Sequence, residues 1–299
     1  MNATLFHLQT LSALHCGTGQ SVGVVDLPIA RARATQLPIV PGSSLRGVLR
    51  QTLEAHDEAL AQHLFGPRQI TRASTSFTGA MTIGDAHLLT LPIRALAGIS
   101  CNVTSPYILT RHARDLRSAG IAAPAIPTPA ETSSALVSGQ SVNLLDERLI
   151  LEELDLTVQT VDAVDHWARW IAKQACPGDA TAQQDFICRF AVVPDAIMGF
   201  LSETAMELRT RISIDEETGT VKRGALWFEE HLPAESVLWG VCSLGRSRAP
   251  GPDAPSADAL AGSLSDRLPM HDGLLLQLGG QAGVGRGLVR LRLLQETAQ

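Results

Sequence analysis

One segment of the sequence, residues 43–64, constrains the fold most strongly because its apolar residues keep a helical spacing throughout. Ser43 or Ser44 can cap the start of a helix there, and Gly66-Pro67 ends it. The apolar residues of this segment are Leu45, Val48, Leu49, Leu53, Leu60 and Leu64. The sequence therefore predicts one amphipathic helix, packed through its leucine face, early in the chain.

The other segments mix strands and helices without a regular alternation of the two. Strands are predicted at 4–14, 79–91, 96–109 and 148–159, and helices at 110–118 and 162–176. Residues 119–141, rich in Ala, Pro and Ser, are typical of a long loop, and residues 246–256 of a flexible connector. A helix to Arg267 and a final strand, loop and strand complete the chain. This order predicts an α+β fold, a ferredoxin-like sheet with large insertions.

A projecting β-hairpin is predicted in the last third of the chain. Residues 206–214 and 221–228 have strand character, and they flank the polar turn Asp215-Glu216-Glu217-Thr218-Gly219. A turn of this kind, ending in glycine, allows the chain to reverse direction.

Composition limits the class of protein. The chain has 299 residues, 45% of them hydrophobic, which suits one elaborated domain or two small ones. Because no apolar run is long enough to span a membrane and the start has no secretory layout, we expect a soluble, cytoplasmic protein without a membrane partner. The odd number of scattered cysteines, without a CxxC pair, predicts buried free thiols: Cys16, Cys101, Cys176, Cys188 and Cys242.

The charges are unevenly distributed along the chain. The net charge of −6 argues against a nucleic-acid partner. However, no acidic residue lies between Asp26 and Glu54, where four arginines fall, or between Asp85 and Asp115, where three do. These arginines are Arg31, Arg33, Arg46, Arg50, Arg94, Arg111 and Arg114. The pattern is compatible with one face for an anionic partner, and equally with chance clustering on solvated loops.

Four stretches of the sequence resemble the RAMP superfamily of CRISPR-associated proteins. They are Leu14–Gly19 running through Gly23–Ile29, Leu37–Arg50, Leu64–Gly66 and Gly279–Gly287. The Leu226–Glu230 stretch and the direct Val25–Pro28 run are similar to the backbone subunit of the type III-B effector, the Cmr complex. One departure is Phe228, which stands where a tyrosine is expected.

The resemblance implies a single RAMP domain, 1–299, built on an RNA-recognition-motif-like core. Its parts would be core strands and first helix in 1–109, an insertion in 110–203, a hairpin thumb in 204–230, and C-terminal strands with a glycine-rich loop in 231–299. The implied partners are guide RNA, complementary target RNA, further copies of the chain in a filament and other type III-B subunits. In the family the thumb wedges into the guide–target duplex, and several copies of the subunit along one guide would cut the target at regular intervals.

Two segments are candidates for contact with an RNA backbone. The first is the helix start at Gly42, where unpaired N–H groups favour a phosphate, although an ordinary capped helix is the simpler alternative. The second is the C-terminal glycine loop, because only twelve residues follow Gly287 and a dinucleotide-binding helix cannot form there. A plain glycine-rich turn remains the alternative. The full predicted RNA-binding set is Gly42, Ser43, Ser44, Arg46, Arg50, Arg31, Arg33, Arg111, Gly283, Gly285 and Arg286.

Asp26 is the leading catalytic candidate. Cleavage of RNA by its own 2′-hydroxyl needs a group that takes the proton, which a carboxylate supplies directly or with Mg²⁺ or another divalent cation bound to it. From the residues alone, an Asx turn before Leu27-Pro28 is the plain alternative. The resemblance implies that Asp26 is the cleavage residue and the metal ligand.

Two further residues are candidates for a catalytic role. His15 could act as an acid or base near neutral pH, and the similarity of the Trp227-Phe228-Glu229 run points to Glu229. Alone, His15 would be structural and Glu229 a surface carboxylate. Two other functions stay open, a guide-binding scaffold that does not cut and a phosphohydrolase built on the His56-Asp57 doublet. That doublet has no spaced partners of the required kind.

Overall fold

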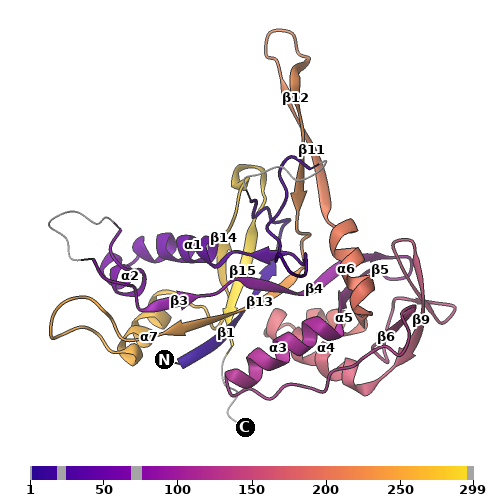
Figure 1. The fold of residues 1–299 in the computed structure, drawn as a ribbon, viewed down its shortest axis with the longest axis horizontal. Helices are drawn as coiled ribbons and strands as arrows, with labels where there is room; N and C mark the ends of the chain where they lie inside the picture. Colours follow the sequence, from indigo (N-terminus) through magenta and orange to yellow (C-terminus); the bar gives the residue numbers. More distant parts are fainter. Residues whose placement is uncertain (1, 19–24, 69–75, 295–299) are drawn as a thin grey trace.

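The computed structural model describes residues 2–18, 25–68 and 76–294, and within these ranges thirteen strands form one sheet (Figure 1). The strand order is β14-β15-β1-β13-β4-β5-β10-β6-β9-β8-β7, with β2 paired to β4 and β3 to β13. The strands are β1 (Asn2–Thr10), β2 (Ile39–Val40), β3 (Met81–Ile83), β4 (Ala86–Ala95), β5 (Ile99–Thr104), β6 (Ser134–Val137), β7 (Leu144–Leu145), β8 (Arg148–Leu151), β9 (Leu154–Thr160), β10 (Phe190–Val192), β13 (Val237–Leu244), β14 (Leu274–Gln277) and β15 (Leu288–Leu293).

Helices lie on both faces of β1, the third strand from the β14 edge of this sheet, and the described residues form seven α-helices in all. They are α1 (Gly42–Glu54), α2 (Glu58–Phe65), α3 (Pro106–Ser118), α4 (Asp162–Ala175), α5 (Ala180–Cys188), α6 (Asp195–Thr204) and α7 (Ala257–Arg267). Successive side chains of a strand point to opposite faces. Accordingly His7 packs against Trp170 of α4 and His112 of α3, while Thr4 lines a cavity together with residues of α7. The core is therefore two-sided, and its mixed α and β content agrees with the fold class expected from the sequence.

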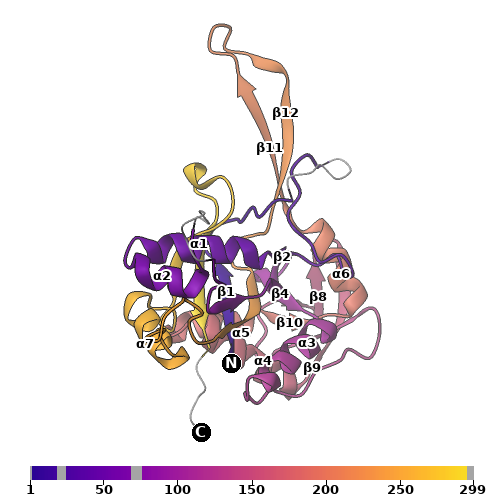
Figure 2. The same cartoon turned by 60° about the vertical axis from the view of Figure 1, so that its left-hand side comes forward.

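A two-stranded hairpin, β11 (Glu207–Ile214) and β12 (Val221–His231), projects from the body (Figures 1 and 2). Thr210 lies opposite Phe228 and Ile212 opposite Leu226, with a register shift before Ile214. Side chains that lie opposite each other share a face. Six large apolar side chains of the hairpin are exposed: Leu208, Ile212, Ile214, Val221, Leu226 and Phe228. Of these, Leu208, Ile212, Leu226 and Phe228 lie on one face, together with Thr210.

The single helix predicted for 43–64 was wrong, because the chain leaves the helix at Ala55 and starts α2 after Asp57. The carboxylate of Asp57 accepts a hydrogen bond of 2.9 Å from the N–H of Leu60, which caps the new helix. The predicted cap by Ser43 or Ser44 was also wrong: Pro41 occupies the N-cap position of α1. A periodic pattern does not report such a break, since the leucines of both helices face one core.

Several other boundaries differ from the prediction. The strand expected over 96–109 ends at Thr104, because Pro106 fits the first position of α3, where its missing N–H costs nothing. The strand expected over 148–159 is the tight pair β8 and β9, and the loop 119–141 contains β6. Cys16, Cys101 and Cys242 are buried as expected, whereas Cys176 and Cys188 are half-buried at the surface ends of α4 and α5.

Candidate functional site

The segment that carries Asp26 pairs with the free edge of β12 at the base of the hairpin. Leu27 donates its N–H to the carbonyl of Phe228 at 3.1 Å, and Glu230 donates to the carbonyl of Leu27 at 3.0 Å. Figure 1 shows these N-terminal loops, in indigo, beside the hairpin base. Residues separated by about two hundred positions in the chain are thereby held together. Gly19, Gly23 and Val24, in the first stretch that resembles the family, lie outside the described residues.

Asp26 is exposed, and one of its carboxylate oxygens is fixed by the protein. The Oδ2 atom accepts a hydrogen bond of 2.8 Å from the backbone N–H of Phe228. An exposed carboxylate with one oxygen fixed in this way presents the group to a substrate in a defined orientation. Phe228 contributes here through its backbone, so the tyrosine hydroxyl that it lacks plays no part in this contact.

Glu229 is buried, at 3% exposure, on the opposite face of β12 from Phe228. Its Oε1 accepts from the indole N–H of Trp227 at 2.7 Å, and Arg211 lies 4.0 Å from Oε2. Burial alone would raise the pKa of Glu229, but hydrogen bonds from Trp227 and Gln281 and the charge of Arg211 hold that pKa below its ordinary value. Glu229 is therefore a carboxylate at neutral pH, engaged within the hairpin base.

His15 is buried next to the Asp26 segment, and its hydrogen bond defines its tautomer. Its Nδ1 lies 2.7 Å from the carbonyl oxygen of Glu230. A carbonyl only accepts, so Nδ1 carries the proton and Nε2 of the neutral ring is free to accept one. A Cβ atom at Gly17 would lie 2.6 Å from this Nε2, so the glycine leaves room for the ring.

The C-terminal glycine loop closes on the same histidine. Gly280 donates its N–H to the carbonyl of His15 at 2.9 Å, and the Oε1 of Gln281 lies 3.3 Å from Nε2 of His231. Gly283 and Gly285 are exposed on the short helix η1 (Ala282–Val284) and its cap, and Arg286 follows, half-buried. The structure thus gathers Asp26, His15, Glu229 and this loop around one strand.

Sequence reasoning missed three side chains of this cluster, Trp227, His231 and Gln281. The rings of His15 and His231 lie 5.4 Å apart, and burial lowers the pKa of His231, so that it is neutral near pH 7. Trp227 lies inside the stretch that carried the family resemblance, which is the one signal that pointed to it. Gln281 likewise lies inside the Gly279–Gly287 stretch that resembles the family, whereas nothing in the sequence singles out His231.

The residues predicted at the start of α1 are not brought into this cluster. The N–H of Gly42 is bound by the carboxylate of Asp85 at 2.8 Å, and a Cβ at Gly42 would strike the backbone of Ile83 and Gly84. The close approach that this glycine permits is therefore to the protein's own backbone. Ser43 is exposed and Ser44 half-buried.

The two arginines of α1 also have partners within the protein. Arg46 donates to the carbonyl of Phe65 and lies over its ring, and Arg50 pairs with Glu54 at 2.7 Å. An RNA contact by either one stays a prediction.

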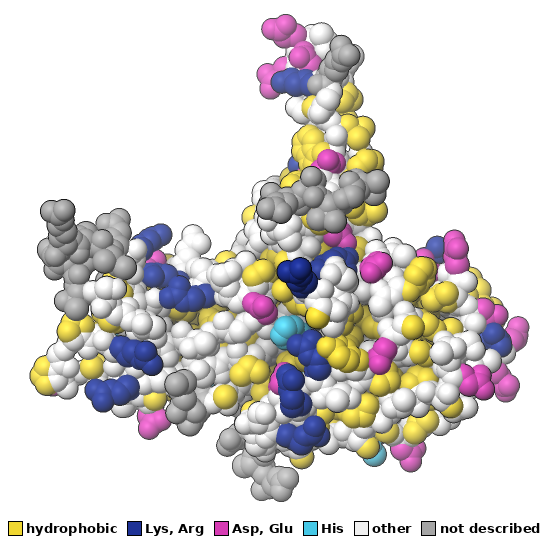
Figure 3. Space-filling view, viewed as in Figure 1, with side chains coloured by type: hydrophobic (Ala, Val, Ile, Leu, Met, Phe, Trp, Pro, Cys, Tyr) yellow, Lys and Arg dark blue, Asp and Glu magenta, His cyan; other side chains and the backbone are white. Residues whose placement is uncertain are grey.

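The other arginines predicted to bind RNA differ in their exposure and in their contacts within the protein. Arg31 is paired with Glu230, while Arg33 is exposed on the following turn. Arg111 lies over the rings of Tyr107 and Trp239, each with its centroid at 5.8 Å. Figure 3 shows Lys and Arg side chains in a band that runs below the hairpin base and over α3. This band supplies positive charge below the hairpin base, despite the acidic net charge.

The oxygen atoms around Asp26 suit a cation site that water and phosphate oxygens complete, and not one in which the protein supplies all the ligands. Within the described ranges, no group of three or more His, Cys, Asp or Glu side chains is placed to hold a metal ion. Mg²⁺ commonly binds through one or two carboxylates, with water and phosphate oxygens as its other ligands. Asp26, with one oxygen held by Phe228, suits that role, whereas Oε1 of Glu229 is taken by Trp227.

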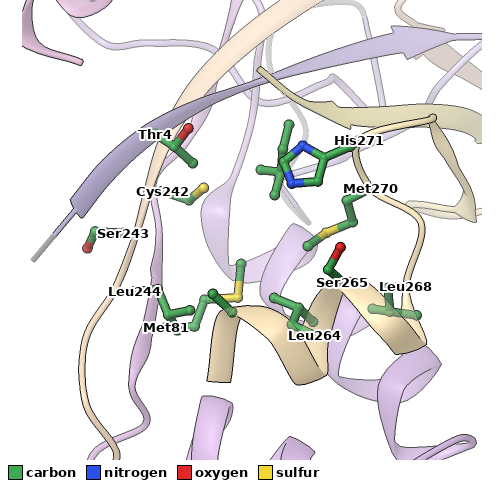
Figure 4. A pocket seen from close by; sticks show the side chains of 12 residues that line it. Thr4, Met81, Cys242, Ser243, Leu244, Leu264, Ser265, Leu268, Met270 and His271 are labelled. Atoms are coloured by element: carbon green, nitrogen blue, oxygen red, sulfur yellow. The ribbon is translucent and has the colours of Figure 1, made fainter. Parts of the chain in front are cut away.

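Two cavities differ in their relation to this site. One, of about 500 Å³, adjoins the Asp26 segment and is lined by Thr18, Val25, Pro28, Ile29, Arg31, Gln36, Glu203 and Glu230. The other, of about 240 Å³, lies under α7 between apolar side chains such as Leu264 and Met270 (Figure 4). The second cavity shares no lining residue with the first. Burial raises the pKa of Cys242 in the second cavity to about 12, which keeps the thiol protonated.

No helix in the described part of the chain is long and apolar enough to cross a membrane.

Comparisons of the sequence and of the structure with known proteins each found similar proteins. The sequence model of the RAMP superfamily matches residues 7–290. The chain is 35% identical to the CRISPR system Cmr endoribonuclease Cmr4 of Pyrococcus furiosus, over 99% of this chain and 97% of the relative. The crystal structure of oligomeric Cmr4 from that organism superposes with a TM-score of 0.74 at 28% identity, covering 99% of both chains. A chain of the type III-B Cmr-beta complex bound to cognate target RNA has the same fold, with a TM-score of 0.69 at 18% identity, covering 97% of this chain and 96% of that one.

Proposed function

Because the chain belongs to the RAMP superfamily, we propose that it is the repeating subunit of a type III-B CRISPR effector, which binds guide RNA and cleaves complementary target RNA. The observation that carries the proposal is the exposed Asp26 carboxylate, fixed by the Phe228 N–H at the base of a projecting hairpin. The relative that matches almost the whole chain is an endoribonuclease by name, which supports the same activity here.

The chemistry proposed for Asp26 is proton transfer during attack of a target 2′-hydroxyl on the adjacent phosphodiester. The carboxylate accepts the hydroxyl proton while the oxygen attacks phosphorus, and the 5′-oxygen of the next nucleotide leaves. One oxygen of Asp26 is held by the protein, so the orientation of the other oxygen is already fixed. Little conformational freedom of this side chain is then lost when RNA binds. His15, with Nε2 able to accept a proton, is the second group with suitable chemistry.

A divalent cation, Mg²⁺ for preference, is part of the proposal, with Asp26 as its protein ligand. When bound, such an ion would stabilise negative charge on the reacting phosphate. The residues themselves orient the segment: Phe228 fixes the carboxylate, and Glu229 with Trp227 and Arg211 stiffens the strand beneath it.

The hairpin is proposed to act as the thumb that displaces a target nucleotide. A continuous A-form duplex holds the scissile linkage out of line for attack by the 2′-hydroxyl, so that the backbone must be distorted locally. The exposed apolar face of the hairpin is chemically suited to stacking against bases rather than to contact with phosphates. Base pairing with the guide would select the sequence, while the protein would read the duplex backbone.

We propose more specifically that the core of the sheet is ferredoxin-like, and the strand order supports this. The antiparallel order β15-β1-β13-β4, with α1 after β1 and α7 after β13, is that of a βαββαβ unit. The long insertions then lie between β4 and β13. Guide RNA, further copies of the chain, other type III-B subunits and a cytoplasmic location complete the proposal.

The decisive experiment replaces Asp26 in a reconstituted complex that contains guide RNA and Mg²⁺. We expect D26A to lower the single-turnover cleavage rate at least about 100-fold, since a positioned proton acceptor is worth 10²–10⁴. The affinity for target RNA should not change. D26N, whose amide oxygen still accepts from Phe228, separates loss of charge from loss of position. Cleavage by D26A at the wild-type rate would show instead a scaffold that does not use this residue to cut.

A further inference from the structure

The carboxylate of Glu230 links β12 to the segment that carries Asp26. Its Oε2 accepts a hydrogen bond of 3.0 Å from the backbone N–H of Ile29, and its Oε1 lies 2.5 Å from Nη2 of Arg31. The side chains of Glu230 and Arg31 are 8% and 16% exposed, so the ion pair is largely shielded from solvent. Both partners of Glu230 belong to the segment directly after Asp26.

Arg31 continues the link in two further directions. Its Nη1 donates to the carbonyl of Gln36 at 2.8 Å, which closes the turn after the segment, and to the carbonyl of Ser202 at 3.0 Å, near the end of α6. The guanidinium group therefore joins three parts of the molecule. A fork of fixed N–H groups suits such a joint better than the single ammonium of a lysine.

The residues from Asp26 to Arg31 are thus held against β12 at both ends. At one end Leu27 pairs with the edge of β12 and Asp26 accepts from Phe228, and at the other end the ion pair holds Ile29 and Arg31. We propose that Arg31 and Glu230 are positioning residues, which set the orientation of Asp26 relative to the hairpin without contacting RNA. The proposal rests on the proposed function and assigns Arg31 a role different from the RNA contact expected of it.

The contacts of the pair favour positioning over RNA binding. A phosphate that drew Arg31 away would leave the carboxylate of Glu230 shielded from water and without its counter-charge, which is unfavourable. It would also break the bonds to Gln36 and Ser202. Arg33, two residues later and exposed, offers a phosphate a charge with no such cost.

Substitution of Glu230 by glutamine tests the proposal in the assembled complex with guide RNA and Mg²⁺. Glutamine keeps the volume but has a single acceptor oxygen, so its NH₂ group must face either the Ile29 N–H or the Arg31 guanidinium. We expect E230Q to lower the single-turnover cleavage rate at saturating target by about 10- to 100-fold, because misplacement by about 1 Å can cost that much. The target Kd should stay at the wild-type value. D185N is the matched control, since it removes the partner of Arg189 in an ion pair of 2.8 Å on α5 and should leave the rate unchanged.

The two roles of Arg31 predict opposite changes in affinity. If Arg31 contacts RNA, E230Q frees a positive charge and tightens target binding with little change in rate, which would overturn the proposal. Hydrogen–deuterium exchange of a peptide covering residues 25–37 gives a readout that does not depend on cleavage. We expect exchange there to rise in E230Q and not in D185N, and unchanged exchange would also overturn the proposal. If D26A cuts like the wild type but exchange still rises in E230Q, the proposed function fails while the positioning contact stands.

Discussion

At the scale of single residues, the ring of His15 leaves no space for a side chain at position 17. The ring is fixed through Nδ1 by the carbonyl of Glu230 and covered by Gly280, so it has little freedom to move aside. The glycine at 17 is therefore required by packing and not by its backbone angle. This requirement links Gly17, in the first stretch that resembles the family, to the histidine of the candidate site.

We expect G17A to displace the His15 ring and break its hydrogen bond to Glu230. The free energy of unfolding should fall by about 1 kcal/mol, the net value of such a bond, and the cleavage rate should fall with it. Thermal or urea unfolding checks the first effect, and a single-turnover assay checks the second. The matched control is G47A, in the middle of α1 with nothing within 4 Å of the added Cβ, which should stabilise the protein by up to about 1 kcal/mol. Equal stability of the two variants would contradict this account of Gly17.

At the scale of elements, the hairpin forms a small sheet of its own, separate from the thirteen-stranded sheet of the body. Among the described residues, its two strands pair only with each other beyond the base, and six of its large apolar side chains are exposed. The base is different: Trp227, Glu229 and Arg211 form a polar cluster there, and the Asp26 segment pairs with the edge of β12. The hairpin is thus an extended arm on a rigid base.

A shortened hairpin should separate folding from cleavage. Replacing residues 213–225 by Asn-Gly joins Ile212 to Leu226, which lie opposite each other, through a two-residue turn. Because the removed part contributes no buried core, the melting temperature and guide-RNA binding should not change. Target cleavage should be lost, since no wedge remains to displace a nucleotide. E216Q, which alters the charge of the tip but not its length, should cut normally, and normal cutting by the shortened form at the same intervals would rule out the wedge role.

At the scale of the whole molecule, the sheet is joined to α3 and α4 by buried aromatic and imidazole rings. The Nε2 atoms of His7 on β1 and His112 on α3 lie 3.4 Å apart, and both rings contact Trp170. Burial, with a smaller effect of Arg292, lowers the pKa of His7 to about 3, and burial with the neighbouring His7 lowers the pKa of His112 as well. Both imidazoles are therefore neutral in the folded protein at pH values where the unfolded chain binds protons.

Stability should consequently fall as the pH is lowered below about 6.5, the ordinary pKa of histidine. In that range the unfolded state binds more protons than the folded state, so the free energy of unfolding rises with pH and declines on acidification. His7, with its pKa lowered to about 3, should contribute about 1.4 kcal/mol per pH unit between pH 5.5 and 4.5, and His112, whose pKa is also lowered, should steepen the slope further. Urea unfolding of the wild type and of H112Q at these pH values measures the difference. A pH slope in H112Q as steep as in the wild type would contradict this role of the buried pair.

The sequence by itself determined what depends on short-range pattern. The leucine face of α1 is buried at Leu45, Leu49 and Leu53, as its spacing required, and residues 207–231 form two strands around a polar turn. Family motifs pointed to Asp26, His15 and Glu229, which the structure gathers around one strand. The leucine face and the hairpin depend on neighbours within a few residues, and periodicity reports them directly, whereas the roles of the three site residues were implied by the family resemblance.

Only the tertiary structure decided which polar groups meet. The contact of Asp26 with Phe228, the pairing of Arg31 with Glu230 and the occupation of the Gly42 N–H by Asp85 join residues 202, 199 and 43 positions apart. No local pattern encodes such contacts, because a charged side chain in the sequence looks the same whether it meets solvent, RNA or a buried counter-charge. The fold selects among these environments through the desolvation cost that each buried polar group must offset with a partner.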